Sequence, residues 1–190
     1  MNFKILIYVF TIFLFSCTKP KYDVIIVGGG ASGITSAIQS SRLGSKTLLI
    51  EKTNWLGGML TSAGVSAMDG NYNMPSGFIK EFRDSLVSYY GSLESLKTGW
   101  VSNIMFEPSV GNKILNSIAQ SESNLDIIFN SSVEEIYSKN DKWELTFYTN
   151  SDLQKVKSKI LIDATELGDL IPMLDICLLY TSDAADEEAS

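Results

Sequence analysis

The chain has 190 residues, of which 45% are hydrophobic and 19% charged, and its formal net charge at pH 7 is −7. This composition is typical of a globular protein, and a net acidic chain without a basic stripe argues against nucleic acid as a partner. The sequence has no histidine, which excludes histidine-based metal sites and histidine acid/base chemistry from this segment. Its two cysteines, Cys17 and Cys177, do not allow a disulfide framework.

Residues 1–16 predict a secretory signal peptide. A lysine precedes an apolar run over residues 5–15, which at ~1.5 Å per residue is too short to cross a ~30 Å hydrocarbon core. The end of this run resembles the lipobox of bacterial lipoproteins, which implies cleavage before Cys17 and lipidation of Cys17. Residues 17–22 then form a tether. We therefore expect a location in the bacterial cell envelope, with the lipid as the only membrane contact; the alternative is an ordinary signal with an incidental cysteine.

The sequence after the tether predicts a strand, a turn, a helix and a second strand. Residues 23–27 form an apolar, β-branched run, which is typical of a strand buried on both faces of a parallel sheet. Apolar residues then recur at helical spacing over residues 31–43, and Gly44 is well placed to end that helix. A second apolar run, residues 47–50, leads directly into Glu51.

The turn has the spacing Gly28-x-Gly30-x-x-Gly33, which suits the pyrophosphate of a dinucleotide. Gly28 permits the tight turn, Gly30 lets the phosphates approach the backbone, and Gly33 lets the helix pack close to the sheet. The helix start adds free N–H groups and the positive end of its dipole. Glu51 can accept hydrogen bonds from both hydroxyls of the adenosine ribose, and it disfavours a 2′-phosphate. The residues predicted to contact this half of the cofactor are Gly28, Gly30, Ala31, Ser32, Gly33, Glu51 and Lys52.

A second glycine pair follows Glu51 closely. Gly57 and Gly58 precede Met59, and a simple nicotinamide dehydrogenase has no need of them. A flavoprotein does, because the rest of a long FAD molecule must lie along backbone here. The alternative is a loop whose glycines serve only turns.

The segment from 23 to 59, together with Asp163-Ala164-Thr165, resembles the FAD-dependent oxidoreductases that have a glutathione-reductase-type FAD domain. It is most similar to the large bacterial FAD-dependent oxidoreductase family, many of whose members are secreted or are lipoproteins. The resemblance covers residues 23–172. It implies FAD as the cofactor and places Gly57, Gly58 and Met59 along it, but it does not fix a substrate.

The middle of the chain predicts two helices. Residues 76–90 have apolar side chains at helical spacing, so Phe82 or Tyr89 could form a substrate wall, although core packing is the favoured interpretation. A second helix is expected from residue 107 to 120, because Pro108 suits a helix start.

Residues 126–129 predict the next strand, and three further strands follow. Turn-forming residues separate these three strands, which indicates an antiparallel meander; they are residues 133–137, 143–149 and 153–156. A meander as the crossover between parallel strands resembles the FAD domain of the family. The resemblance also implies that the backbone at Val133 contacts adenine, the alternative being simply a valine between two strands.

Residues 159–165 return to an apolar strand that ends on small residues. The resemblance implies that Ala164 and Thr165 pack against the dinucleotide. Glu166 stands where the family commonly has glycine, which puts a close backbone contact there in doubt. Asp163 has the chemistry of a catalytic carboxylate, but a structural role at the strand end is favoured.

Residues 177–190 do not continue the preceding pattern and resemble translated sequencing-adapter sequence. We therefore expect the FAD-binding domain to span residues 23–176 and the natural protein to continue beyond it in a different sequence. The alternative is a genuine acidic tail.

These observations predict an α/β fold: an FAD-binding, Rossmann-like parallel sheet with helices, a meander crossover and a ligand at the carboxyl ends of the strands. The predicted function is that of the N-terminal part of a cell-envelope oxidoreductase that moves hydride or electrons between a small organic substrate and flavin. We name no catalytic residue and no metal ligand, and we expect this part alone to be inactive. The alternatives are an NAD-linked dehydrogenase and a non-catalytic surface lipoprotein that uses the fold as a binding scaffold.

Overall fold

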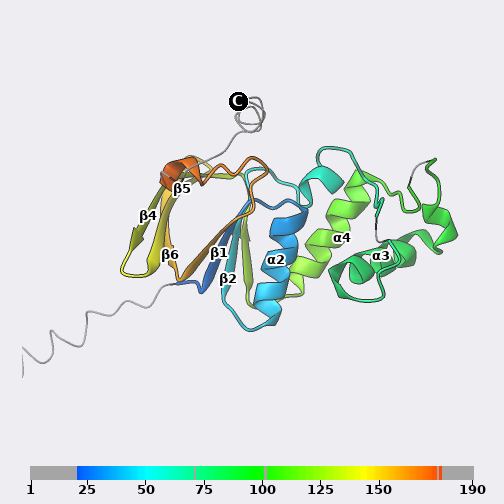
Figure 1. Ribbon diagram of the computed structural model, residues 1–190, viewed down its shortest axis with the longest axis horizontal. Helices are drawn as coiled ribbons and strands as arrows, with labels where there is room; N and C mark the ends of the chain where they lie inside the picture. The colour runs from blue at the N-terminus through cyan, green and yellow to red at the C-terminus, as the bar shows by residue number, and fades with distance from the viewer. Residues whose placement is uncertain (1–20, 71, 101, 175, 177–190) are drawn as a thin grey trace, which may run out of the picture.

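A computed structural model of the chain describes residues 21–70, 72–100, 102–174 and 176. The predicted signal peptide, the predicted lipidation site Cys17 and the tail 177–190 lie outside the described residues. Figure 1 shows the described part as three layers: an antiparallel meander, a parallel sheet and a set of helices. The α/β fold expected from the sequence is confirmed.

The parallel sheet has the strand order β3-β2-β1-β7. Its strands are β1 (Val24–Val27), β2 (Thr47–Ile50), β3 (Leu125–Ile128) and β7 (Ile160–Asp163). Every residue of β1 and β2 is buried, as their unbroken apolar sequences predict. Because β1 is paired on both sides, the glycine-rich turn that follows it lies between the carboxyl ends of β2 and β7.

The meander covers one face of this sheet. Its strands are β4 (Ser131–Lys139), β5 (Lys142–Thr149) and β6 (Asp152–Ser158), paired in that order. Two-residue turns join them, and Asn140, Asp141, Asn150 and Ser151 all have positive φ angles, as such hairpin turns require. The sequence correctly placed the three strands, but each is longer than predicted.

Helices lie on the opposite side of the sheet, one packed directly on β1 and β2 and the other two further out. They are α2 (Ala31–Arg42), α3 (Gly77–Tyr90) and α4 (Pro108–Gln120), with short 3₁₀ turns η1 (Gly58–Leu60), η2 (Glu94–Leu96) and η3 (Pro172–Leu174). Helix α2 ends where expected: Gly44 has φ +88°, its N–H bonds to Ser41, and the next N–H reaches back to Ser40. This pattern satisfies carbonyls that a helix end otherwise leaves free.

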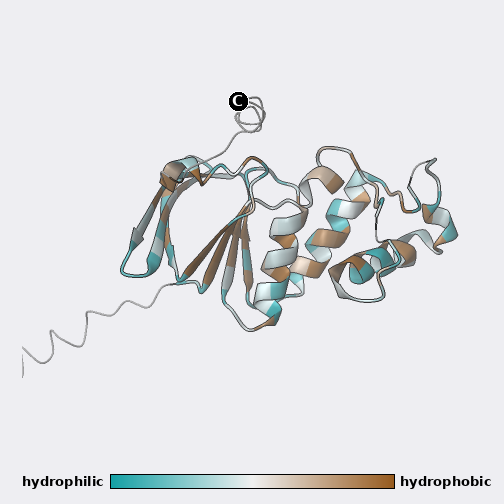
Figure 2. Cartoon of the chain, viewed as in Figure 1, coloured by the Kyte–Doolittle hydropathy of each residue, from teal (hydrophilic) through white to brown (hydrophobic). Residues whose placement is uncertain are grey.

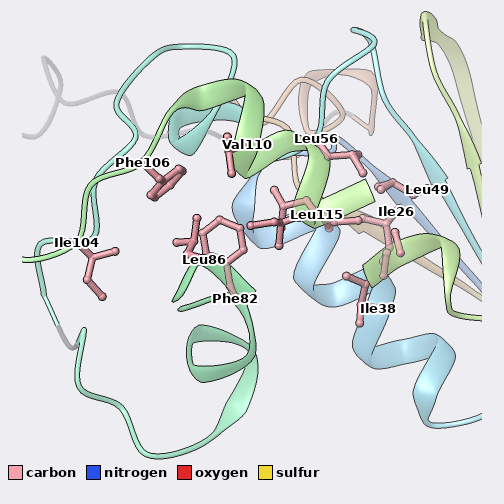
Figure 3. Packing of buried hydrophobic residues seen from close by; sticks show 14 of the residues in the cluster. Ile26, Ile38, Leu49, Leu56, Phe82, Leu86, Ile104, Phe106, Val110 and Leu115 are labelled. Carbon is pink, nitrogen blue, oxygen red and sulfur yellow. The ribbon is translucent and has the colours of Figure 1, made fainter. Parts of the chain in front are cut away.

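Two hydrophobic cores lie on the two faces of the parallel sheet. Alternate residues of β1 belong to different cores: Ile26 faces the helices, and Ile25 faces the meander. The strands of this sheet are accordingly the most continuously hydrophobic elements in Figure 2. Figure 3 shows the helix-side core, where Phe82 of α3 meets Phe106 edge to face at 5.4 Å between ring centres. Phe82 is 3% exposed, as the favoured core interpretation predicts, whereas Tyr89 is 52% exposed, so core packing is wrong for Tyr89.

An ion-pair cluster links the three helices at the surface. The Arg42 guanidinium donates two hydrogen bonds to Glu81 of α3 and a third to Glu122, just beyond α4, each 2.7 Å long. The hydrogen bonds from Arg42 hold the pKa of the Glu81 carboxyl below its usual range. Bidentate pairs of this kind add geometric specificity, here to the contact between α3 and α2 at the surface.

No helix in the described ranges combines the length and the apolar character needed to cross a membrane. The same part of the chain contains no group of three or more acidic, histidine or cysteine side chains arranged to hold a metal ion.

Candidate functional site

A cavity of about 1160 Å³ opens at the carboxyl ends of β1, β2 and β7. This is the edge of an open parallel sheet at which ligands bind. Every residue predicted to contact the cofactor lines this cavity except Gly33 and Gly57. The lining residues among those predicted are Gly28, Gly30, Ala31, Ser32, Glu51, Lys52, Gly58, Met59, Val133, Ala164 and Thr165.

The three glycines of the turn are required for three different structural reasons. Gly28 has φ +99°, and a Cβ there would lie 2.4 Å from the carbonyl oxygen of Ala164. A Cβ on Gly33 would lie 1.8 Å from the Gly28 oxygen, so only glycine allows α2 to approach β1 this closely. A Cβ on Gly30, by contrast, would meet nothing within 4 Å, because this residue borders the cavity. The space beside Gly30 is therefore available to a phosphate group.

The start of α2 offers backbone donors at this same place. Gly30 is the N-cap residue and provides no side chain to bond the first-turn amides. Ala31 and Ser32 both line the cavity, and helix N–H groups in the first turn have no partner within their own helix. Together with the helix dipole, they make an anion-binding position.

Glu51, at the end of β2, is 8% exposed and bridges two loops. Its Oε2 accepts a hydrogen bond from the Gly29 N–H at 2.5 Å. Its Oε1 accepts from the Thr53 N–H at 2.8 Å and from the Thr53 hydroxyl at 2.7 Å. The carboxylate thus holds the glycine-rich turn and the following loop together at the cavity wall.

The second glycine pair packs directly on the first. The Gly57 N–H donates to the Gly29 carbonyl at 2.8 Å, and a Cβ on Gly58 would lie 3.0 Å from the Cα of Gly30. Gly57 has φ +107° and faces away from the cavity, against Leu115 of α4. Gly57 therefore shapes the loop, whereas Gly58 and Met59 form cavity wall.

The opposite wall of the cavity is formed by the segment after β7, which hydrogen bonds to the Asp163 carboxylate hold in place. Asp163 Oδ1 accepts from the Thr165 N–H and hydroxyl at 3.0 and 2.7 Å, and its Oδ2 accepts from the Leu170 N–H at 3.1 Å. The Thr165 hydroxyl oxygen in turn accepts from the Asp169 N–H at 2.7 Å. With these bonds Asp163 orders the segment that follows β7, in line with the structural role favoured from the sequence. Glu166, on this segment, lines the cavity.

Val133 lies within β4, where a bulge shifts the pairing between Val133 and Glu135. It is thus inside a strand rather than between two strands, and it lines the cavity at the end nearest the meander. The register shift re-aims this part of the strand, as bulges next to binding sites commonly do.

Lys52 is the one cationic side chain among the cavity's lining residues in the described part of the chain, beside Glu51, Glu166 and Asp169. A bound pyrophosphate would therefore be met mainly by backbone amides and the helix start rather than by arginine. The residues present fit the adenosine diphosphate half of FAD: a backbone cradle with open space beside Gly30, and an acid at the end of β2.

Sequence reasoning missed two residues of this site. Gly29 occupies a position that the glycine spacing leaves free, yet a Cβ there would lie 2.8 Å from Glu51 Oε2. Thr53 was not singled out, yet it contacts Glu51 through two donors. A threonine two residues after the acid was the one available signal, since its hydroxyl can reach back along the chain.

A second, smaller cavity of about 270 Å³ lies on the other side of the α2 start. Its lining is almost wholly apolar and includes Ile34, Leu60, Phe78 and Leu115. Ala31 contributes to both cavities.

Comparison with known proteins now identifies the family. The model of the family described as FAD dependent oxidoreductase matches residues 23–188. The chain belongs to the FAD-dependent oxidoreductase family. Membership in this family implies FAD as the cofactor.

Curated relatives share only part of their length with this chain. The carotenoid phi-ring synthase of Chlorobaculum tepidum is 30% identical over 105 residues, which are 55% of this chain and 16% of that protein. The NADH:fumarate oxidoreductase of Klebsiella pneumoniae is 36% identical over 87 residues, 44% of this chain and 9% of that protein. The chain therefore spans less than a fifth of either relative.

Solved structures agree on the fold. AlpK has a TM-score of 0.61 at 12% identity, covering 83% of this chain and 34% of that one. The p-nitrophenol 4-monooxygenase of Pseudomonas putida has a TM-score of 0.55 at 15% identity, covering 80% of this chain and 43% of that one. At these identities the likeness shows a shared FAD-enzyme fold and nothing of the substrate.

Proposed function

We propose that this chain is the FAD-binding part of a cell-envelope oxidoreductase that transfers hydride or electrons between a small organic substrate and flavin. One observation carries the proposal: two glycine segments, Glu51 and the end of β7 converge on a single cavity at the carboxyl edge of the parallel sheet. FAD, when bound, supplies the redox chemistry, and the protein binds and orients it. Flavin reduction by a small organic substrate would contradict the alternative of a non-catalytic scaffold.

In this proposal each wall of the cavity has a separate role. The backbone cradle for the pyrophosphate is formed by Gly28, Gly30, Ala31 and Ser32, and Gly33 supports it by letting α2 pack close to β1. The adenosine side is held by Glu51 with Lys52. The backbone at Val133 faces adenine. Further along the cofactor, Gly58 and Met59 form the wall, in a loop whose shape Gly57 sets. Ala164 and Thr165 close the cavity beside β7.

Replacing Glu51 is the direct test of the adenosine side. In the Glu51→Ala variant we expect FAD to bind at least about tenfold more weakly, because hydrogen bonds to a charged group contribute about 1.5–3 kcal/mol each. Fluorescence titration of the purified chain with FAD measures this. Glu144→Ala is the matched control, since Glu144 pairs with Lys157 on the meander and does not line the cavity. Undiminished FAD affinity in Glu51→Ala would contradict the assignment.

The envelope location is supported by the apolar run and Cys17 in the sequence. We expect a Cys17→Ser variant, expressed in a bacterial host, to lose its lipid and to move from the membrane fraction to the soluble fraction. Immunoblotting of the two fractions and labelling with a radioactive fatty acid measure this. Equal labelling and fractionation of Cys17→Ser and the parent chain would show that Cys17 is not the anchor.

A further inference from the structure

The Glu51 carboxylate is oriented by a residue that the glycine and acid pattern does not include. The Thr53 N–H and hydroxyl both donate to Glu51 Oε1, at 2.8 and 2.7 Å. The hydroxyl oxygen also accepts a hydrogen bond from the Trp55 N–H at 3.1 Å, which fixes the threonine rotamer. Two donors on one carboxylate oxygen oppose rotation of the carboxylate about its last bond.

The position of Thr53 does not depend on its own hydroxyl. The Thr53 carbonyl accepts a hydrogen bond from the Asn130 N–H at 3.0 Å, and the Glu51 carbonyl accepts from the Ser131 N–H at 3.0 Å. The backbone of this loop is thus held to the start of the meander independently of the side chain. Thr53 is also exposed, so its side chain carries no core packing. Removing the hydroxyl therefore removes one donor to Glu51 and the side-chain bonds to the Trp55 backbone, while the Thr53 backbone stays bonded to Asn130.

The hydrogen bonds leave one oxygen of Glu51 with capacity for a ligand. An ionised carboxylate has about four acceptor positions. Thr53 uses two of them on Oε1, and the Gly29 N–H uses one on Oε2. The remaining position is on Oε2, at the residue that lines the cavity beside the glycine-rich turn.

We propose that Thr53 is a positioning residue that holds Glu51 so that its Oε2 accepts a hydrogen bond from a hydroxyl of the adenosine ribose. The inference rests on the proposed role of Glu51. It goes further by assigning recognition of the ribose to the Glu51–Thr53 pair and to a single carboxylate oxygen, Oε2. The sequence alone suggested that Glu51 accepts hydrogen bonds from both ribose hydroxyls.

The test uses ADP and 2′,3′-dideoxy-ADP as probes with the full 190-residue chain, because both carry the adenine and pyrophosphate and only ADP carries the ribose hydroxyls. Isothermal titration gives the Kd of each probe for the parent chain, Thr53→Val and Thr53→Ser. We expect Thr53→Val to weaken ADP about tenfold, the loss of one hydrogen bond to a charged acceptor, and to leave dideoxy-ADP unchanged. Thr53→Ser, which keeps the hydroxyl, should bind ADP as the parent does.

Thr35→Val is the matched control. It removes a threonine hydroxyl that bonds the Ala31 carbonyl within α2 and does not line the larger cavity. We expect it to bind both probes like the parent. Melting temperatures of the unliganded variants, which should agree with the parent, separate a positioning role from a loss of fold.

Three outcomes would overturn the inference. If Thr53→Val weakens both probes equally, Thr53 supports the loop rather than the ribose contact. If it weakens neither, Glu51 holds its orientation without the hydroxyl. If the parent chain binds ADP and dideoxy-ADP equally well, the ribose role of Glu51 is itself wrong and the proposed adenosine site fails with it; the first two outcomes leave that site standing.

Discussion

Gly33→Ala is expected to destabilise the chain by about 3 kcal/mol or more, at the upper end of what overpacking a core costs. A Cβ at this position would lie 1.8 Å from the Gly28 oxygen, 2.9 Å from its carbonyl carbon and 3.1 Å from the Ala164 Cβ. The nearest atoms are backbone, so no side chain can rotate away. Helix α2 would have to move off the sheet, which opens the contacts of Ile34 and Ile38 with the helix-side core.

Urea denaturation followed by circular dichroism measures this loss. Gly30→Ala is the matched control, because it adds the same methyl group three residues earlier in the same turn, where nothing lies within 4 Å. We expect it to cost at most about 1 kcal/mol, since alanine is a poorer N-cap than glycine. Equal stabilities of Gly33→Ala and Gly30→Ala would show that the close approach of α2 to β1 is not a constraint on the fold.

The sequence was most informative where consecutive residues determine both an element and the turn that follows it. The apolar run of β1, the glycine spacing and the helix period of α2 are local patterns, and the structure has strand, turn and helix at those residues. The meander was likewise visible, because asparagine, aspartate and serine at its turns adopt positive φ angles. The first of these patterns supplies one continuous part of the cavity wall, from Val27 to Ser32.

What the sequence could not supply depends on contacts between distant segments. That the Gly29 amide reaches Glu51 requires β1 and β2 to pair in one register, which neither strand specifies alone. The bulge beside Val133 is a mismatch between two strands and leaves no mark in either. The lengths of β4 and β6 were underestimated because their outer residues are polar and give no apolar pattern. These residues nevertheless pair with β5 through their backbones.

Gly30→Val is expected to leave the fold intact and to abolish most of the cofactor affinity. Gly30 has φ −60° and ψ −178°, an extended conformation open to valine, and a Cβ there meets nothing within 4 Å. The cost to stability is that of a poorer N-cap, about 1 kcal/mol. The added side chain fills the space through which a pyrophosphate reaches the amides of Ala31 and Ser32, so both the close approach and the hydrogen bonds are lost.

We expect FAD to bind Gly30→Val about a hundredfold more weakly than the parent chain, equivalent to about 2.7 kcal/mol. ADP should lose affinity by the same factor, because both ligands share the pyrophosphate, whereas adenosine, which has no phosphate, should lose little. Titration with the three ligands separates this effect from that of Glu51→Ala, which should weaken adenosine as well. If Gly30→Val instead weakens adenosine as strongly as ADP, the valine distorts the whole cavity, and the open space beside Gly30 is not the phosphate position.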